Sequence, residues 1–221
     1  MHKLILSIDL DEFYHIRWVS GSPNAVYQNS QEYFREIYGS DKPKGDLYEQ
    51  TATILDILNI EQVKCTFFIL GEVAENYPDV VKKISENGHE VACHSYRHID
   101  LTFHSRQSFK KELRQAKSLL EDITGQGVIG FRMPNLIIKE WVKDTLIELG
   151  FSYDSSICPS RSLTGKFGDF MDYPVYPYKT KIDSFEQGES DFWEFPLPVF
   201  PILKMPGSTG SVTRAFGGWW T

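Results

Sequence analysis

The sequence lacks several features that mark membrane, secreted or nucleic-acid-binding proteins. It has no run of about 18 apolar residues, and the apolar run of residues 4–8 stops at Asp9, so we expect no membrane span and no cleaved leader. Its three cysteines, Cys65, Cys93 and Cys158, show no paired spacing, which favours reduced thiols and a cytoplasmic location. Acidic residues outnumber basic ones by 30 to 23, and the net charge of −7 disfavours a nucleic-acid partner.

Two common catalytic signatures are also missing. No glycine-rich phosphate loop follows an apolar strand pattern, and the G-x-S-x-G sequence of serine hydrolases does not occur. Aromatic residues, in contrast, make up 14% of the chain. Their rings fill protein cores and also line sugar sites, so their number alone does not decide between these roles.

Short apolar runs alternate with helical patterns along the chain, which predicts an α/β protein with a parallel sheet or barrel in a single domain, residues 1–221. The long aromatic-rich connection that ends near residue 45 is typical of a substrate-facing surface. We expect strands at 3–9, 63–70, 89–93, 128–131, 151–153 and 192–195, and helices at 46–58, 78–86, 106–124 and 138–149.

Acids and imidazoles collect where the expected strands end. Asp9 and Asp11 end the first strand, His94 and His98 follow the third, and Arg132 and Asp154 follow the fourth and fifth. The carboxyl ends of parallel strands meet at one edge of a sheet or barrel, which is where such folds place their active sites. The pattern therefore predicts one shared site.

The pair His94-x-x-x-His98 is the strongest of these signals. Imidazoles four residues apart share one face of a helical turn, and with one carboxylate they form a two-histidine, one-carboxylate metal site. The competing interpretation is two surface or capping histidines. Asp9 and Asp11 would face the same side of a continuing strand, where one could bind the ion and the other act as base. The alternative for them is an acidic loop.

The remaining candidates have weaker support from the sequence. Arg132 can hold a catalytic carboxylate through a paired hydrogen bond, or it can be a surface arginine beside a turn. Asp154 can orient that arginine or cap a turn. His15 and His104 fit structural or substrate-facing roles better than metal binding.

These motifs together resemble the polysaccharide deacetylase superfamily, carbohydrate esterase family four, in the branch whose first motif reads D-x-D/E. The resemblance implies a distorted (β/α) barrel, with the C-terminal part atypical or incomplete, and a metal-dependent hydrolase that removes N-acetyl groups from amino sugars. It extends over residues 4–160 and is carried by residues 7–15, 65–71, 88–98, 130–135 and 153–156, with a weaker block at 193–196.

The resemblance also implies a role for each matching residue. Asp9 would be the general base, held by Arg132, with Asp154 as a further catalytic-site residue. Asp11, His94 and His98 would bind one divalent ion, zinc or a substitute such as cobalt, with Glu12 as a second candidate ligand. Tyr14, Pro134 and Asn135 would contact the substrate, an amino-sugar glycan or its precursor. The expected absence of a leader separately favours a cytoplasmic precursor in surface polysaccharide synthesis.

One departure from the family leaves alternatives open. The family has a late histidine that protonates the leaving amine, but the last histidine here is His104. Loss of a positioned acid typically slows a reaction by about 10²–10⁴-fold. A weak or inactive, glycan-binding relative is therefore one alternative. A hydrolase of another C–N bond, in a formamide or a cyclic amide, is the other.

Overall fold

The computed structural model describes residues 5–15, 26–160, 170–200 and 205–206. The chain divides into two compact units, Met1–Gly130 and Phe131–Thr221. The single domain expected for residues 1–221 stays a prediction. None of the helices in these described ranges has the length and apolar character needed to cross a membrane.

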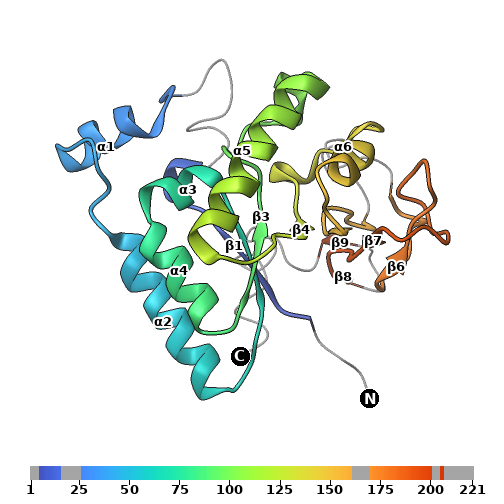
Figure 1. Ribbon diagram of the computed structural model, residues 1–221, viewed down its shortest axis with the longest axis horizontal. Coiled ribbons are helices and arrows are strands. Elements are labelled where there is room, and N and C mark those ends of the chain that lie inside the picture. The colour runs from blue at the N-terminus through green and yellow to red at the C-terminus, as the bar shows by residue number, and fades with distance from the viewer. Residues whose placement is uncertain (1–4, 16–25, 161–169, 201–204, 207–221) are drawn as a thin grey trace. The chain divides into compact units, whose positions relative to one another are not determined.

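The first unit is built on three parallel strands, in the order β1 (Ser7–Leu10), β2 (Thr66–Ile69) and β3 (Glu90–Cys93). Figure 1 labels the two outer strands of the three, β1 and β3. The central strand is apolar and buried over its last three residues, as a strand covered on both faces requires. Asp9 of β1 is level with Phe68 of β2, which is level with Ala92 of β3. The three strands therefore end together, and the loops that follow β1 and β3 emerge at the same edge.

Helices connect these strands, as the sequence predicts. The longest begins after Ser105, whose side chain accepts a hydrogen bond from the backbone of Ser108 in a capping box, and ends at Gly125 with a φ of 67°. Its inner stripe of apolar residues is buried. The helices of the unit are α1 (Ser30–Tyr38), α2 (Asp46–Ile60), α3 (Gly71–Asn76), α4 (Pro78–Glu86) and α5 (Arg106–Thr124).

Two of these helices differ from the sequence-based expectation. The stretch before residue 45 holds α1, capped by Asn29 and packed through Tyr33 and Phe34 against Tyr14. The short helix α3 follows β2 directly, beginning at Gly71. Both were missed because their formation depends on packing with distant residues, which local periodicity does not reveal.

The second unit has shorter strands. Here β5 (Tyr153–Asp154) pairs in parallel with β7 (Trp193–Glu194), and β6 (Tyr178–Lys179) pairs with β7 in the antiparallel direction. The predicted helix at 138–149 is shorter than expected, and α6 spans Val142–Glu148. The remaining strands are β4 (Gly130–Phe131), at the junction of the units, and the antiparallel pair β8 (Val199–Phe200) and β9 (Met205–Pro206).

Candidate metal centre

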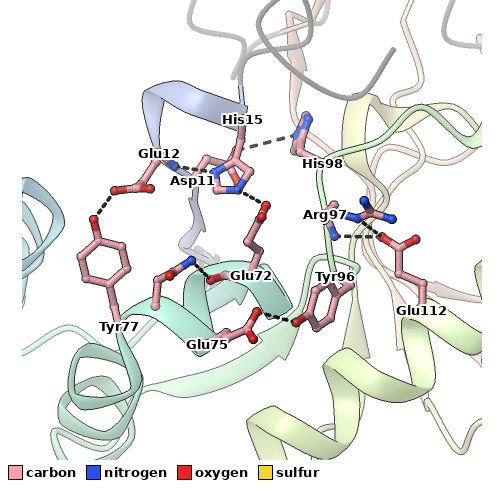
Figure 2. Close-up of polar contacts among 11 residues, drawn as sticks. Asp11, Glu12, His15, Glu72, Glu75, Tyr77, Tyr96, Arg97, His98 and Glu112 are labelled. Carbon is pink, nitrogen blue, oxygen red and sulfur yellow. Dashed lines mark hydrogen bonds and ion pairs between the residues drawn. The ribbon is translucent and has the colours of Figure 1, made fainter. Parts of the chain in front are cut away.

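Three of the predicted site residues come together at the edge where β1 and β3 end. Asp11, His94 and His98 offer ligand atoms that all lie within 4.8 Å of one another. The Nε2 atom of His98 is 3.8 Å from Asp11 Oδ2 (Figure 2), and the rings of His94 and His98 lie 5.2 Å apart. The prediction that these three side chains share a site is therefore consistent with their placement.

The local conformation behind the two imidazoles differs from the expected helical turn. Residues 94–98 form an irregular loop, in which Ser95 adopts a φ of 71°, a left-handed value uncommon for a residue other than glycine. Two backbone N–H groups at the start of α3 donate hydrogen bonds to this loop. The imidazoles are brought together by tertiary contacts, and the spacing of four reflects a tight loop instead of a helix.

The three side chains suit a divalent cation. Asp11 Oδ1 and His98 Nδ1 are buried and have no hydrogen-bond partner, a state that costs about 1–3 kcal/mol for each polar group unless a ligand contacts it. Burial, followed by the charges of His94 and His15, lowers the pKa of His98 well below its ordinary value. His98 is therefore neutral at pH 7 and has a lone pair for a metal ion.

The carboxylate of the set is destabilised in the absence of positive charge. Burial raises the pKa of Asp11, His94 and His15 act in the opposite direction, and the charge of Asp9 raises it further. A bound cation would favour the ionised form of Asp11 and offset the repulsion from Asp9. Two imidazoles and a carboxylate form a donor set that suits zinc and similar transition metals.

The other two acids of the first motif are placed differently. Asp9 lies in β1 with an exposed side chain, close enough to Asp11 for the two charges to interact. Glu12, the second candidate ligand, accepts a hydrogen bond from the hydroxyl group of Tyr77 and lies outside the three-residue cluster (Figure 2). Asp11 is therefore the carboxylate that the structure groups with the imidazoles.

A buried pair beside the cluster was not predicted. His15 Nδ1 accepts a hydrogen bond from the backbone N–H of Glu12 at 3.0 Å, and His15 Nε2 lies 3.2 Å from Glu72 Oε2 (Figure 2). Burial is the largest single influence on the pKa of Glu72 and raises it, but the hydrogen bond and charge of His15, with smaller contributions from Ser30 and Arg97, together lower that pKa below its ordinary value. Glu72 lies just after the end of a strand of the parallel sheet, as Asp11 and His94 do, so the same strand-end rule had a signal for it.

Tyr14, expected at the substrate, has only 2% of its surface exposed. Its ring packs in an aromatic cluster with Tyr33 and Phe34. The predicted contact of Tyr14 with substrate stays a prediction.

The other predicted residues belong to the second unit. Arg132 donates from Nε to Ser155 O at 2.9 Å and from a terminal nitrogen to Ser155 Oγ at 2.7 Å. Pro134 and Asn135 lie in a 3₁₀ turn (Pro134–Leu136), where Asn135 has a φ of 56°. Because the relative placement of the units is not determined, their predicted roles at Asp9 and at the substrate stay predictions.

Asp154 forms a buried acidic pair with Glu194 on the neighbouring strand. Ser156 donates to Asp154 from Oγ at 2.6 Å, and the backbone N–H of Ile157 donates to Glu194 Oε1 at 3.0 Å. Both carboxyl groups belong to fully buried residues, and Glu194 Oε2 has no hydrogen-bond partner. Burial raises the pKa of Asp154 to about 6 and raises that of Glu194 well above its ordinary value.

Comparisons with known proteins agree with the resemblance. Residues 41–153 match the family model for polysaccharide deacetylase. A peptidoglycan-N-acetylglucosamine deacetylase of Bacillus cereus is 31% identical over 122 residues, 48% of this chain and 44% of that protein. A peptidoglycan deacetylase-like protein of Gibberella zeae is 36% identical over 155 residues, 70% of this chain and 44% of that protein. The matched stretches therefore cover less than half of each relative.

A solved structure supports the fold over most of the chain. A polysaccharide deacetylase candidate from Mycobacterium smegmatis superposes with a TM-score of 0.56 at 23% identity, over 86% of this chain and 59% of that one. At this identity the likeness establishes the fold alone. The prediction of an α/β fold of the polysaccharide deacetylase barrel type is confirmed.

Proposed function

Because the chain belongs to the polysaccharide deacetylase family, we propose that it is a metal-dependent hydrolase that removes N-acetyl groups from amino sugars of a polysaccharide or its precursor. The observation that carries this proposal is the cluster of Asp11, His94 and His98, with two buried ligand atoms that lack a hydrogen-bond partner. The B. cereus relative is named for action on N-acetylglucosamine in peptidoglycan, which favours a 2-acetamido sugar as the substrate class.

In this proposal Asp11, His94 and His98 hold one divalent ion, with zinc as the ion that suits the donor set best. When bound, that ion would supply positive charge to polarise the acetamide carbonyl and to acidify a nearby water. The buried, neutral imidazole of His98 keeps a lone pair for binding. The chain therefore provides the negative charge and the lone pairs that a catalytic cation needs.

Asp9 is the proposed general base. It lies two residues before Asp11, its side chain is exposed, and its charge interacts with that of Asp11. As water attacks the carbonyl carbon, Asp9 would accept a proton from it, which leaves a tetrahedral oxyanion. The C–N bond then breaks as the nitrogen gains a proton, and Asp9 is our candidate to return the one it took. Arg132 is proposed to orient Asp9, and Asp154 to support Arg132.

The substrate contacts are proposed for the loops that follow β1 and β4. The backbone N–H of Tyr14 is a candidate donor to the oxyanion, a type of contact worth roughly 3–4 kcal/mol in other hydrolases. Pro134 and Asn135 are proposed to shape the acyl pocket.

Acetate release from N-acetylglucosamine oligomers, measured with and without added zinc, tests the proposal. The wild type should release acetate only with a divalent ion, and His94→Ala should lose both the ion and the activity. Asp9→Asn should keep zinc binding but lose about 10²–10⁴-fold in rate, the usual contribution of a general base. Asp191→Asn, the same change at an exposed site, should behave as the wild type. A folded wild type that binds no divalent ion would refute the proposal.

A second candidate function is glycan binding without turnover. The specific observation in its favour is that no histidine follows His104, so residues 105–221 offer no imidazole to protonate the leaving amine. This candidate predicts zinc and oligosaccharide binding with no acetate release. A panel of N-acetyl, N-formyl and cyclic-amide compounds would also detect hydrolysis of another C–N bond.

A further inference from the structure

The start of helix α3 contacts both loops that carry the clustered side chains. We call residues 11–15 the first ligand loop, because it contains Asp11, and residues 94–98 the second ligand loop, because it begins at His94 and ends at His98. Residues 71–72 follow β2, the strand between β1 and β3, and so lie between the two loops. Figure 2 shows Glu72 below Asp11 and His15 and beside the second loop.

The side chain of Glu72 contacts the first ligand loop. Its Oε2 atom lies 3.2 Å from His15 Nε2, and the two side chains are 8% and 2% exposed. His15 Nδ1 accepts a hydrogen bond from the backbone N–H of Glu12 at 3.0 Å, so the ring proton is on Nε2 and points to Glu72. The ring of His15 therefore links Glu72 to the backbone of the residue directly after Asp11.

The backbone of the same residue contacts the second ligand loop. The N–H of Glu72 donates to Tyr96 O and the N–H of Gly71 donates to Ser95 O, both at 2.9 Å. The aromatic ring of Tyr96 lies against Gly71 so closely that a Cβ atom there would be 2.4 Å from it. The absence of a side chain at Gly71 thus allows the second loop to approach α3 at this distance.

From these contacts we propose that Glu72, acting through His15, is a positioning residue that holds the first ligand loop at a fixed distance from the second. The inference rests on the proposed metal site and assigns a function to two residues outside it. A ligand carboxylate that is free to move away from the imidazoles binds an ion more weakly, and loss of such supporting hydrogen bonds typically costs about 10–100-fold in metal affinity. The backbone bonds of Gly71 and Glu72 fix one loop, and the Glu72 side chain fixes the other.

Zinc affinity of the purified full chain, measured by calorimetry, tests this independently of turnover. Glu72→Ala and His15→Ala should each weaken zinc binding by about 10–100-fold. Glu72→Gln keeps an oxygen that can accept the hydrogen bond from His15 Nε2, so it should stay within about threefold of wild type. Glu86→Ala is the matched control, because it removes a carboxylate of the same charge from an exposed position on α4. Glu86 pairs with Lys82 and touches neither ligand loop, so its loss should have little effect.

The double variant His15→Ala/Glu72→Ala distinguishes a pair from two separate effects. If Glu72 acts through His15, the double variant loses no more affinity than either single variant. Additive losses of zinc affinity in the double variant would overturn the inference. A loss in Glu72→Gln as large as that in Glu72→Ala would also overturn it, because it would show that the charge of Glu72 matters and its hydrogen bond does not. Circular dichroism confirms folding, and if Glu72→Ala does not fold, Glu72→Gln and His15→Ala carry the comparison.

The outcomes separate this inference from the proposed function. Zinc binding that depends on Glu72 in a wild type that releases no acetate would refute the deacetylase proposal and leave the positioning role standing. Acetate release and zinc binding that are both unchanged in Glu72→Ala would refute the positioning role alone. A folded wild type without affinity for zinc would refute both.

Discussion

Replacing Glu194 with glutamine should remove a pH dependence from the stability of this protein. Asp154 and Glu194 lie directly opposite each other on β5 and β7, and both are fully buried. Two carboxylates in such a place cannot both be ionised without a large electrostatic cost. A proton on the partnerless Glu194 Oε2 would give that oxygen a hydrogen bond to Asp154 and remove the repulsion. Burial and the charge of Asp154 raise the pKa of Glu194 by more than the positive charge of Arg132 lowers it.

The sign follows from the raised pKa values of the pair. The folded protein holds a proton that the unfolded chain releases above the ordinary carboxyl pKa of about 4. Stability therefore falls as the pH rises above about 4, through the pKa of Asp154 at about 6, and on towards the pKa of Glu194, which is raised well above its ordinary value. One extra bound proton corresponds to about 1.4 kcal/mol per pH unit. A glutamine at position 194 can donate an N–H to an ionised Asp154, so the variant should lack this slope.

Urea unfolding between pH 5 and pH 6, followed by tryptophan fluorescence, measures the effect. The free energy of unfolding of the wild type should fall by at least about 1.4 kcal/mol more than that of Glu194→Gln over this interval. Other titrating groups affect both proteins equally and cancel in the difference. Glu189→Gln, the same change at an exposed site, should keep the wild-type slope. Parallel curves for the wild type and Glu194→Gln would refute the shared proton.

Three further substitutions test the packing around the site and the fold. Gly71→Ala places a Cβ atom 2.4 Å from the Tyr96 ring and should lower stability by about 1–3 kcal/mol in urea unfolding, a loss that Tyr96→Ala should partly reverse. Ser105→Ala removes the cap of α5 and should cost about 1 kcal/mol, and an unchanged urea midpoint would contradict the capping role. Lys143→Met removes an ammonium group bonded to three carbonyls of residues 181–184, so it should lower the melting temperature and cost about 1–3 kcal/mol.

The sequence was sufficient where a local signal and a general rule coincide. The helix between Ser105 and Gly125 has a cap, an apolar stripe and a terminating glycine, and the structure shows it at the predicted place. The clustered residues were predicted because Asp11 and His94 follow apolar strands, and strand ends of a parallel sheet converge. Applied without exception, the same rule would also have included Glu72.

Other features depended on contacts between residues distant in sequence. The nine residues of α1 are stabilised by aromatic packing on Tyr14, which their own periodicity does not reveal. The loop after β3 was expected to be a helical turn, because the four-residue spacing of His94 and His98 occurs in helical turns and in tight loops alike. Its conformation depends on hydrogen bonds from α3 and on the close contact between Tyr96 and Gly71.

The sequence by itself determined the fold class, the family and the residues available to bind an ion. Each of these depends on the residue types and on their order along the chain, both of which are read directly from the sequence. The tertiary structure decided which carboxylate joins the imidazoles, how His15 and Glu72 support the first ligand loop, and which buried acids must share a proton. Those outcomes depend on distances and burial between residues from separate segments, and the linear order of a chain does not specify them.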